Sequence, residues 1–487
     1  MLKDQQKASR IIKINFPGGF VPVGDLLCLL ESLHDVGVQQ ARIGTRQQMY
    51  FSLTDDHLIE LEYELSAQEL TIDIDQDSHP NIMSSYVADG IFTQGGWVRE
   101  GIYKDIISSF DYKPKLKINI AENNQSLVPF YTGNLNFISS KVSNYWHLYI
   151  RWPKTNHLYV WSTLVYSLDI AAISNLLENL ILDPPSIFSS TDLDQQGIAI
   201  EKRVVESNKF HFQPKNEDLT VPEFRLPYYE GFNKHEGTYW LGIYRPDEVY
   251  TTEFLLDICK ICQQTRVGQF YTTPWKSLII KDIQENDRYV WDLLLDKHRF
   301  NLRHSSNELN WQTQDWSTEA LGLKKSVVNY FNLHNIRTYR LSFGVKIDPS
   351  SDVWGCIMIT KTRNSEGTPR YEVQHTSDFN ANSRQMVPYR SQVSLRGLPK
   401  VLNELCYSYY HQRHIDNTAR QKEHLSTTPQ TVSTEKHQYQ CPNCLSIYDS
   451  EYGDALAGIH AGTAFEELPE SYQCGLCQEP KRLFKKL

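Results

Sequence analysis

Four cysteines near the carboxyl end are the residues whose type and spacing predict chemistry most directly. They form two Cys-x-x-Cys pairs, Cys441 with Cys444 and Cys474 with Cys477. Each pair can form a tight turn that directs two thiolates at one ion, and two such turns complete a tetrahedral site. About 30 residues lie between the pairs, whereas a zinc ribbon usually has roughly 15–20 there. Spacing by itself still permits zinc, so the pairs predict a four-thiolate site without choosing the metal.

The residues around these pairs favour iron. The first pair is followed by Ile447-Tyr448-Asp449, and the segment before the second pair contains Gly453-Asp454, Gly462-Thr463, Phe465-Glu466 and Leu468-Pro469. In this pattern residues 438–487 resemble the rubredoxin family. The resemblance implies a small β-rich domain in which the four cysteines hold one iron that cycles between Fe³⁺ and Fe²⁺. A zinc site without redox activity is the alternative.

Four positions depart from the pattern of that family, and two of these are Gly475 for the usual proline and Tyr472 for the usual tryptophan. The other two, Leu445 and Gln478, stand where the family usually has a glycine after each pair. A glycine there supplies a backbone conformation with positive φ, so we expect a shifted reduction potential, without a predicted sign. Four thiolates leave no coordination position open for a substrate. The site is therefore predicted to relay electrons, and no catalytic residue is predicted.

A change of composition separates this tail from the rest of the chain. Residues 415–437 contain few apolar side chains, which follow no period that would bury one face. This composition predicts a flexible linker. It would connect a body, residues 1–414, to the metal domain of residues 438–487.

Two segments of the body share one order of predicted elements: strand, turn, amphipathic helix, strand. Apolar residues recur at helical spacing in both, namely Leu26, Leu29, Leu30 and Leu33 in one and Leu255, Ile258, Cys259 and Cys262 in the other. A basic or aromatic turn follows each helix, Thr45-Arg46-Gln47 or Thr273-Pro274-Trp275-Lys276. An internal duplication is the simplest explanation, with repeats in residues 1–230 and 231–414.

Several stretches of the body occur in the order and spacing of one known family. They are "NFPGGFVPVGDLLCLLESL", "IGTRQQMYF", "KPKLKINI" and "TTPWKSLII". They resemble the siroheme-type nitrite/sulfite reductase family, which implies an α+β fold of duplicated, ferredoxin-like halves related by a pseudo-twofold axis. The resemblance also implies that Arg46, Lys115 and Lys117 contact an anionic tetrapyrrole or oxyanion. Lys115 and Lys117 would alternate along a strand and point to one face; an exposed edge strand is the alternative.

The cysteines that hold a four-iron cluster in that family are missing. The first two would fall near residues 310–316, and the other two just after "IRTYRLS", but neither stretch contains a cysteine. Asn, Trp or Lys cannot replace soft thiolate ligands, so we expect no 4Fe-4S cluster and no six-electron reduction. Cys259 and Cys262 lie on the apolar stripe of their helix, which favours buried packing over a second metal site.

Charge and hydropathy narrow the function further. A net charge of −9 gives no indication of nucleic-acid binding, and no apolar run is long enough to span a membrane. Sparse cysteines predict a reducing, cytoplasmic location. We therefore predict an electron-transfer protein that exchanges single electrons with a redox partner protein. The alternatives are an oxyanion reductase with a siroheme or other tetrapyrrole in the body, and a zinc-stabilised interaction scaffold.

Overall fold

The computed structural model describes residues 9–67, 72–93, 95–183, 192–348, 351–427, 438–454 and 457–486. The chain divides into two compact units, Met1–Tyr410 and His411–Leu487. Among the described residues, no helix combines the length and the apolar character that crossing a membrane requires.

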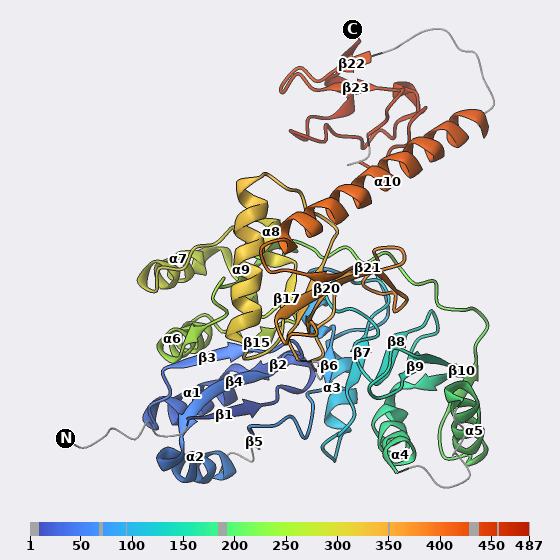
Figure 1. Cartoon of the computed structure of the whole chain (residues 1–487). Helices are drawn as coiled ribbons and strands as arrows, with labels where there is room; N and C mark the ends of the chain where they lie inside the picture. Colours follow the sequence, from blue (N-terminus) through green and yellow to red (C-terminus); the bar gives the residue numbers. More distant parts are fainter. Residues whose placement is uncertain are drawn as a thin grey trace. The chain divides into compact units, whose positions relative to one another are not determined.

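Two five-stranded sheets form one part of the body, and the two halves of the chain build them reciprocally (Figure 1). The first sheet has the order β14-β3-β4-β1-β5 and the second the order β2-β15-β16-β13-β12. Strand β2 of the first half pairs with β15, and strand β14 of the second half pairs with β3. The bounds are β1 Ser9–Ile14, β2 Phe20–Pro22, β3 Gln40–Ile43, β4 Met49–Thr54, β5 Ile72–Ile74, β12 Gly231–His235, β13 Thr238–Ile243, β14 Tyr250–Thr251, β15 Gln269–Thr272 and β16 Leu278–Ile283. This exchange of strands is the pseudo-twofold arrangement expected of a duplication.

Helices α1 (Val23–Asp35) and α6 (Thr252–Gln264) are the equivalent helices of the two halves, and they pack against each other. The predicted apolar stripes are buried in one shared core. Cys259 and Cys262 are fully buried in it, as predicted. Helices α2 (Asp55–Ala67) and α7 (Arg288–Lys297) follow β4 and β16 in the two halves.

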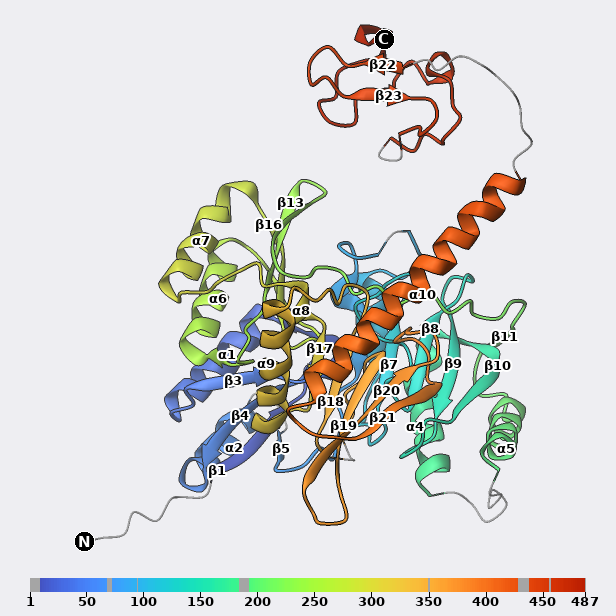
Figure 2. The same ribbon diagram turned by 45° about the horizontal axis from the view of Figure 1, so that its top comes forward.

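Two further sheets, one from each half of the chain, have equivalent strand arrangements (Figure 2). In each sheet the first three strands are parallel and the following strands are antiparallel. A helix, α3 (Glu100–Ser108) or α9 (Thr318–Leu333), connects the first two strands. The strands are β6 Met83–Ser84, β7 Ile118–Ala121, β8 Leu135–Ser139, β9 Tyr145–Arg151, β10 Leu158–Tyr166 and β11 Phe212–Pro214 in one sheet, and β17 Trp311–Thr313, β18 Phe343–Lys346, β19 Ile357–Arg363, β20 Pro369–Thr376 and β21 Met386–Val393 in the other. The duplicated α+β body is therefore confirmed.

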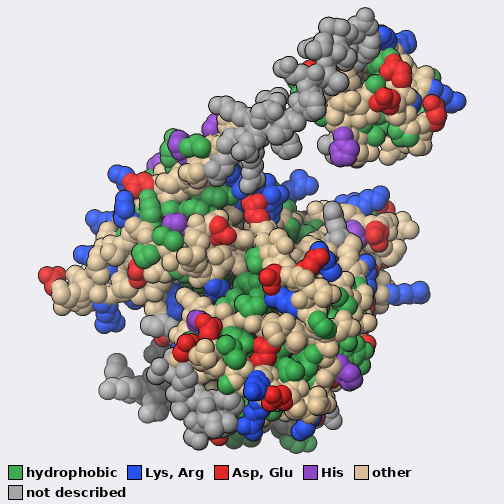
Figure 3. Space-filling model, turned by 90° about the vertical axis from the view of Figure 1, so that its right-hand side faces the viewer, with side chains coloured by type: hydrophobic (Ala, Val, Ile, Leu, Met, Phe, Trp, Pro, Cys, Tyr) green, Lys and Arg blue, Asp and Glu red, His purple; other side chains and the backbone are tan. Residues whose placement is uncertain are grey.

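Helices complete the body around these sheets. Helix α4 (Ile170–Leu182) follows β10, and α5 (Leu193–Glu206) comes next; the short α8 (Ser306–Leu309) precedes β17. On the face shown in Figure 3, lysines, arginines and carboxylates of the body are interspersed and do not form a single basic area.

The strand expected to carry Lys115 and Lys117 begins later than predicted, at Ile118. The backbone N–H of Lys115 donates to the Glu178 carboxylate, and that of Lys117 donates to the Asn134 side chain. Side-chain oxygens thus accept the hydrogen bonds of these two backbone N–H groups, in place of the carbonyl groups of a neighbouring strand. The predicted alternation of these two lysines along a strand is wrong for this reason.

Helix α10 (Leu398–Thr427) corrects the predicted linker over its first part. Its first turns are anchored because Leu398, Leu402 and Leu405 are buried in the body core. Residues 415–427 contain neither proline nor glycine, so nothing in them breaks the helix. The remainder of the predicted linker, residues 428–437, lies outside the described residues.

The C-terminal unit contains the predicted small β-rich domain. Strand β22 (Gln438–Gln440) pairs with both β23 (Ile447–Asp449) and β24 (Lys485–Lys486). An aromatic core holds the domain together, and in it the rings of Tyr439 and Phe465 stack with centroids 3.9 Å apart.

Candidate functional site

Four sulfur atoms converge in the C-terminal unit. The Sγ atoms of Cys441 and Cys477 lie 3.5 Å apart, as do those of Cys444 and Cys474. All four sulfurs lie within 4.8 Å of one another, and all four cysteines are free. Sulfurs bound at ~2.3 Å to one tetrahedral ion would be about 3.8 Å apart. The donor set and its spacing therefore fit a single tetrahedral metal ion.

Each Cys-x-x-Cys pair is held in a loop by its neighbours. The first loop joins β22 to β23, and the second lies between the short helices η6 (Phe465–Glu467) and η7 (Lys481–Leu483). Tyr472 donates to Asp454 at 2.8 Å, and the buried Lys481 ammonium donates to the backbone oxygen of Leu468 at 2.6 Å. Leu445 and Gln478 both have a φ of 60°. The loops thus keep the left-handed conformation at these two positions without glycine.

The four thiols influence one another's protonation. Although burial opposes it, hydrogen bonds from Ser446 and from the backbone N–H groups of Leu476 and Cys477 lower the pKa of Cys474 to about 6. The backbone N–H of Glu479 favours the Cys477 thiolate, but burial and the neighbouring sulfurs raise the pKa of Cys477 to about 12. Four thiolates so close together need a cation to neutralise them, because like charges disfavour ionisation.

Two of the four sulfurs are partly accessible. Cys441 and Cys474 are buried, whereas Cys444 and Cys477 are half-buried. Leu445 and Leu476 flank them and are 64% and 73% exposed. The four-sulfur site therefore lies just beneath a surface to which two exposed leucines contribute.

Arg46 is buried inside the body, where its guanidinium donates to backbone oxygens. Nε and one terminal nitrogen, Nη2, donate to the Asn81 carbonyl at 3.1 and 2.9 Å, and Nη2 also donates to Ile118 at 2.9 Å. The other terminal nitrogen, Nη1, is buried and has no partner among the described residues. Burial lowers the pKa of Arg46 to about 10, so the side chain remains a cation at neutral pH.

Lys117 belongs to a cluster of cations, whereas Lys115 does not. The ammonium of Lys117 pairs with the carboxylate of Asp352. The charge of Asp352 also acts on Arg46, Arg151, Lys346 and Arg384. We call Arg46, Lys117, Arg151, Lys346 and Arg384 the cation cluster. Lys115 is exposed, and it is its backbone N–H that makes the contact with Glu178.

Burial and repulsion between the cations lower the pKa of two members of this cluster, Arg384 and Lys346. Burial lowers the pKa of Arg384 well below its usual value, and Arg151 lowers it further. Burial, aided by the neighbouring cations, also lowers the pKa of Lys346. Arg384 stacks on Trp354, with its guanidinium carbon 3.5 Å from the ring centroid, and its Nε is buried without a partner among the described residues. Asp352 acts on all five cations and Asp77 also acts on Arg46, so the cations outnumber these carboxylates and the site is suited to an additional anion.

Sequence reasoning did not find Arg151, Lys346, Arg384 or Asp352. The sequence did mark the positions of Arg151, which immediately precedes "WPKTNH", and Arg384, which immediately follows "HTSDFNANS". In the resemblance to the reductase family, these two stretches stand where that family has glycine-rich loops that approach its cofactor. Lys346 lies in the stretch just after "IRTYRLS" that lacks the cluster cysteines of that family, whereas no local pattern distinguishes Asp352 from other charged residues.

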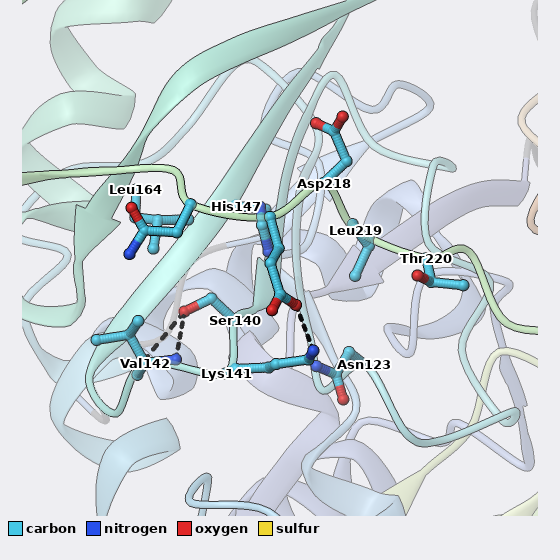
Figure 4. Close-up of a pocket in the computed structure, with 11 residues that line it drawn as sticks. Asn123, Ser140, Lys141, Val142, His147, Leu164, Asp218, Leu219 and Thr220 are labelled. Carbon is cyan, nitrogen blue, oxygen red and sulfur yellow. Dashed lines mark hydrogen bonds and ion pairs between the residues drawn. The ribbon is translucent and has the colours of Figure 1, made fainter.

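A separate pocket of about 340 Å³ lies beside β9 and β10 (Figure 4). Its rim carries the exposed ion pair of Lys141 with Glu217, and Ser140 donates to the backbone oxygen of Val142 at 3.1 Å. Burial, and then Lys215, lower the pKa of His147 in this pocket to about 4. His147 is therefore neutral at physiological pH. Among the described residues it is not part of any group that could hold a metal.

Comparisons with known proteins identify the C-terminal domain. The family model named Rubredoxin matches residues 438–484. The Rubredoxin-2 of Chlorobaculum tepidum is 44% identical over 50 residues, which are 10% of this chain and 96% of that protein. The Probable rubredoxin of Methanothermobacter thermautotrophicus is 42% identical over 50 residues, 79% of its length. The High molecular weight rubredoxin of Moorella thermoacetica is 35% identical over 103 residues, 20% of this chain and only 40% of that protein.

A solved structure matches most of the chain. The NirA protein of Mycobacterium tuberculosis superposes with a TM-score of 0.60, covering 81% of this chain and 80% of that protein at 14% sequence identity. The nitrite/sulfite reductase-type body is thus confirmed as a fold. The four-sulfur site and the rubredoxin match together support a single iron. In its C-terminal domain this chain belongs to the rubredoxin family, and that domain is joined to a body with the fold of NirA.

Proposed function

We propose that this chain is a one-electron transfer protein in which Cys441, Cys444, Cys474 and Cys477 hold one iron. The observation that carries the proposal is the cage of four mutually close sulfurs. An iron bound there supplies one-electron redox chemistry. Because all four ligands come from the protein, no position is left for a substrate, and the electron must pass to or from a partner.

The partner in this proposal is a redox protein, either the reductase that donates the electron or its terminal acceptor. The partly exposed sulfurs of Cys444 and Cys477 and the exposed side chains of Leu445 and Leu476 support contact at this surface. An apolar surface over the metal excludes water on docking and brings a second redox centre close. In this proposal the body serves as a docking scaffold and does not itself reduce an oxyanion.

The test is an absorption spectrum with metal analysis on full-length protein purified without air. We expect one iron per chain, a red ferric-thiolate spectrum and bleaching by dithionite. Cys441→Ser should abolish the spectrum, whereas Cys28→Ser should leave it unchanged because Cys28 is an exposed cysteine of helix α1. A colourless protein with one zinc would instead support the interaction scaffold.

A second function is favoured by the cation cluster, which supports binding of a polycarboxylate tetrapyrrole such as siroheme in the body. Nη1 of Arg46 and Nε of Arg384 are buried donors that an anionic ligand would satisfy. Such a ligand would have no thiolate link, since the stretches expected to carry the cluster cysteines contain none. The protein would then be an oxyanion reductase that receives electrons from its own iron domain.

Titration of the protein with siroheme, followed by absorption, tests this second function. We expect Lys117→Ala and Arg384→Ala to weaken binding at least tenfold if the cluster holds the carboxylates. Lys115→Ala is the matched control, because this exposed lysine lies two positions away but outside the cluster. Equal loss of binding in the control would point to nonspecific attraction.

A further inference from the structure

The two metal-binding loops have nearly the same backbone. In the first loop the N–H of Cys441 donates to the oxygen of Ser446 at 2.9 Å, and the N–H of Leu445 donates to the oxygen of Cys441 at 3.0 Å. In the second loop the N–H of Cys474 donates to the oxygen of Glu479 at 2.8 Å, and the N–H of Gln478 to the oxygen of Cys474 at 2.8 Å. Ser446 and Glu479 therefore occupy equivalent positions.

Their side chains break this equivalence. The hydroxyl oxygen of Ser446 lies 3.0 Å from Sγ of Cys474 in the other loop and 3.2 Å from Sγ of Cys444 in its own loop. The carboxylate of Glu479 accepts instead from the Asn443 amide, at 3.4 Å. One hydroxyl therefore reaches the sulfurs from one side only, and it bridges the two loops.

The hydroxyl must be the donor once a metal is bound. Metal-bound cysteines are thiolates, which carry no proton and only accept hydrogen bonds. Ser446 is then left with one O–H group to direct at the sulfur of Cys474 or Cys444. Such a bond stabilises negative charge on the sulfur.

The consequence is a preference for the reduced state. Four thiolates with Fe³⁺ carry a net charge of −1, and the same ligands with Fe²⁺ carry −2. One electron enters from an external donor, no covalent bond forms or breaks, and the ligands become more negative. A hydrogen bond to those ligands is therefore stronger after reduction than before it.

We propose that the Ser446 hydroxyl raises the reduction potential of the metal centre by donating a hydrogen bond to its thiolate ligands, chiefly to Cys474. This inference rests on the proposed electron-transfer function and assigns a direction to the shifted potential. Ser446 is a tuning residue in this role and not a metal ligand, because the four sulfurs complete the tetrahedron.

The experiment is a redox titration of the full-length, iron-loaded protein, followed by its visible absorption. Ser446→Ala should lower the affinity of the ferric site for an electron by about tenfold, which is about 59 mV for one electron. Ser446→Thr keeps the hydroxyl and should restore most of the difference. Glu479→Gln alters the equivalent position of the other loop and should not lower the potential, because it removes a negative charge.

A matched pair covers the case in which the alanine variant fails to hold iron. Ser446→Thr and Ser446→Val have nearly the same shape and differ by a hydroxyl against a methyl group, so the valine variant should have the lower potential. Equal potentials in this pair, or an unchanged potential in Ser446→Ala with its iron spectrum intact, would overturn the inference. A wild-type protein without redox-active iron would instead contradict the proposed function, so the two failures are distinguishable.

Discussion

The ammonium of Lys117 forms an ion pair with the carboxylate of Asp352, which lies between strands β18 and β19 in the second half of the body. The charge of the same carboxylate also acts on the other four members of the cation cluster. The carboxylate of Asp352 thus lies among cations that would also attract an anionic ligand. Its ion pair with Lys117 links the second half of the duplicated fold to the first.

Replacing this carboxylate should destabilise the body in a way that anions reverse. Asp352→Asn leaves the partly buried Lys117 without its counter-ion, so we expect a loss of about 3 kcal/mol. Sulfate should restore part of the stability, and chloride at equal ionic strength should restore less, because a divalent oxyanion can bridge several cations. Thermal unfolding followed by tryptophan fluorescence reports on the body alone, since all ten tryptophans precede residue 411.

Glu217→Gln is the control for that substitution. Glu217 pairs with Lys141, but both side chains are mostly exposed, so a change of well under 1 kcal/mol is expected. Equal losses in the two variants would show that Asp352 has no special place among the cations.

The buried acid Glu248 should make the body sensitive to low pH. Its carboxylate lies 2.8 Å from the ammonium of Lys276 and 3.3 Å from that of Lys324. Burial by itself would raise its pKa, but the two lysines lower it to about 2. The stabilisation, about 3 kcal/mol, is present above the ordinary pKa of a glutamate and is lost as the pH falls from about 5 to 2. Guanidinium unfolding at a series of pH values should show a shallower acid decline in Glu248→Gln.

The buried acid Glu122 should make the body sensitive to high pH, in contrast to Glu248. Burial, with the charge of Asp89, raises its pKa to about 7. Its contribution to stability is complete below the ordinary glutamate pKa and is lost as the pH rises through about 7. We therefore expect Glu122→Gln to raise the free energy of unfolding at pH 8 by about 2–3 kcal/mol and to change it little at pH 4, as measured by guanidinium unfolding. A variant that is equally stabilised at both pH values would contradict the assigned pKa.

Glycine at residue 445 should strengthen the first metal loop. Leu445 has a φ of 60° and is mostly exposed, so relief of the left-handed strain, about 1–2 kcal/mol, exceeds the entropic cost of glycine, about 0.5–1 kcal/mol. The guanidinium concentration that bleaches the iron spectrum should rise in Leu445→Gly. Leu476→Gly provides the comparison: this exposed leucine has no positive φ, so its replacement should lower that concentration.

How much could be read from the sequence depended on how local each feature is. The four cysteine ligands were predictable because each Cys-x-x-Cys pair forms its own turn. The buried faces of α1 and α6 were predictable because apolar residues recur at helical spacing along each of them. The duplication followed from two such patterns in the same order. The lack of an apolar stripe in residues 415–427 predicted a linker. This prediction was wrong because α10 continues through these residues, which contain no proline or glycine that would end it.

The sequence by itself determined the four-sulfur site, the duplicated body and the absence of cysteines where the reductase family places its cluster ligands. Only the tertiary structure decided which cations gather around Asp352, that Lys115 is not one of them, and that Ser446 reaches a cysteine of the opposite loop. The physical reason is the same in each case. These contacts join side chains that are distant in the chain, and their energies depend on burial and on interatomic distances that no local spacing encodes.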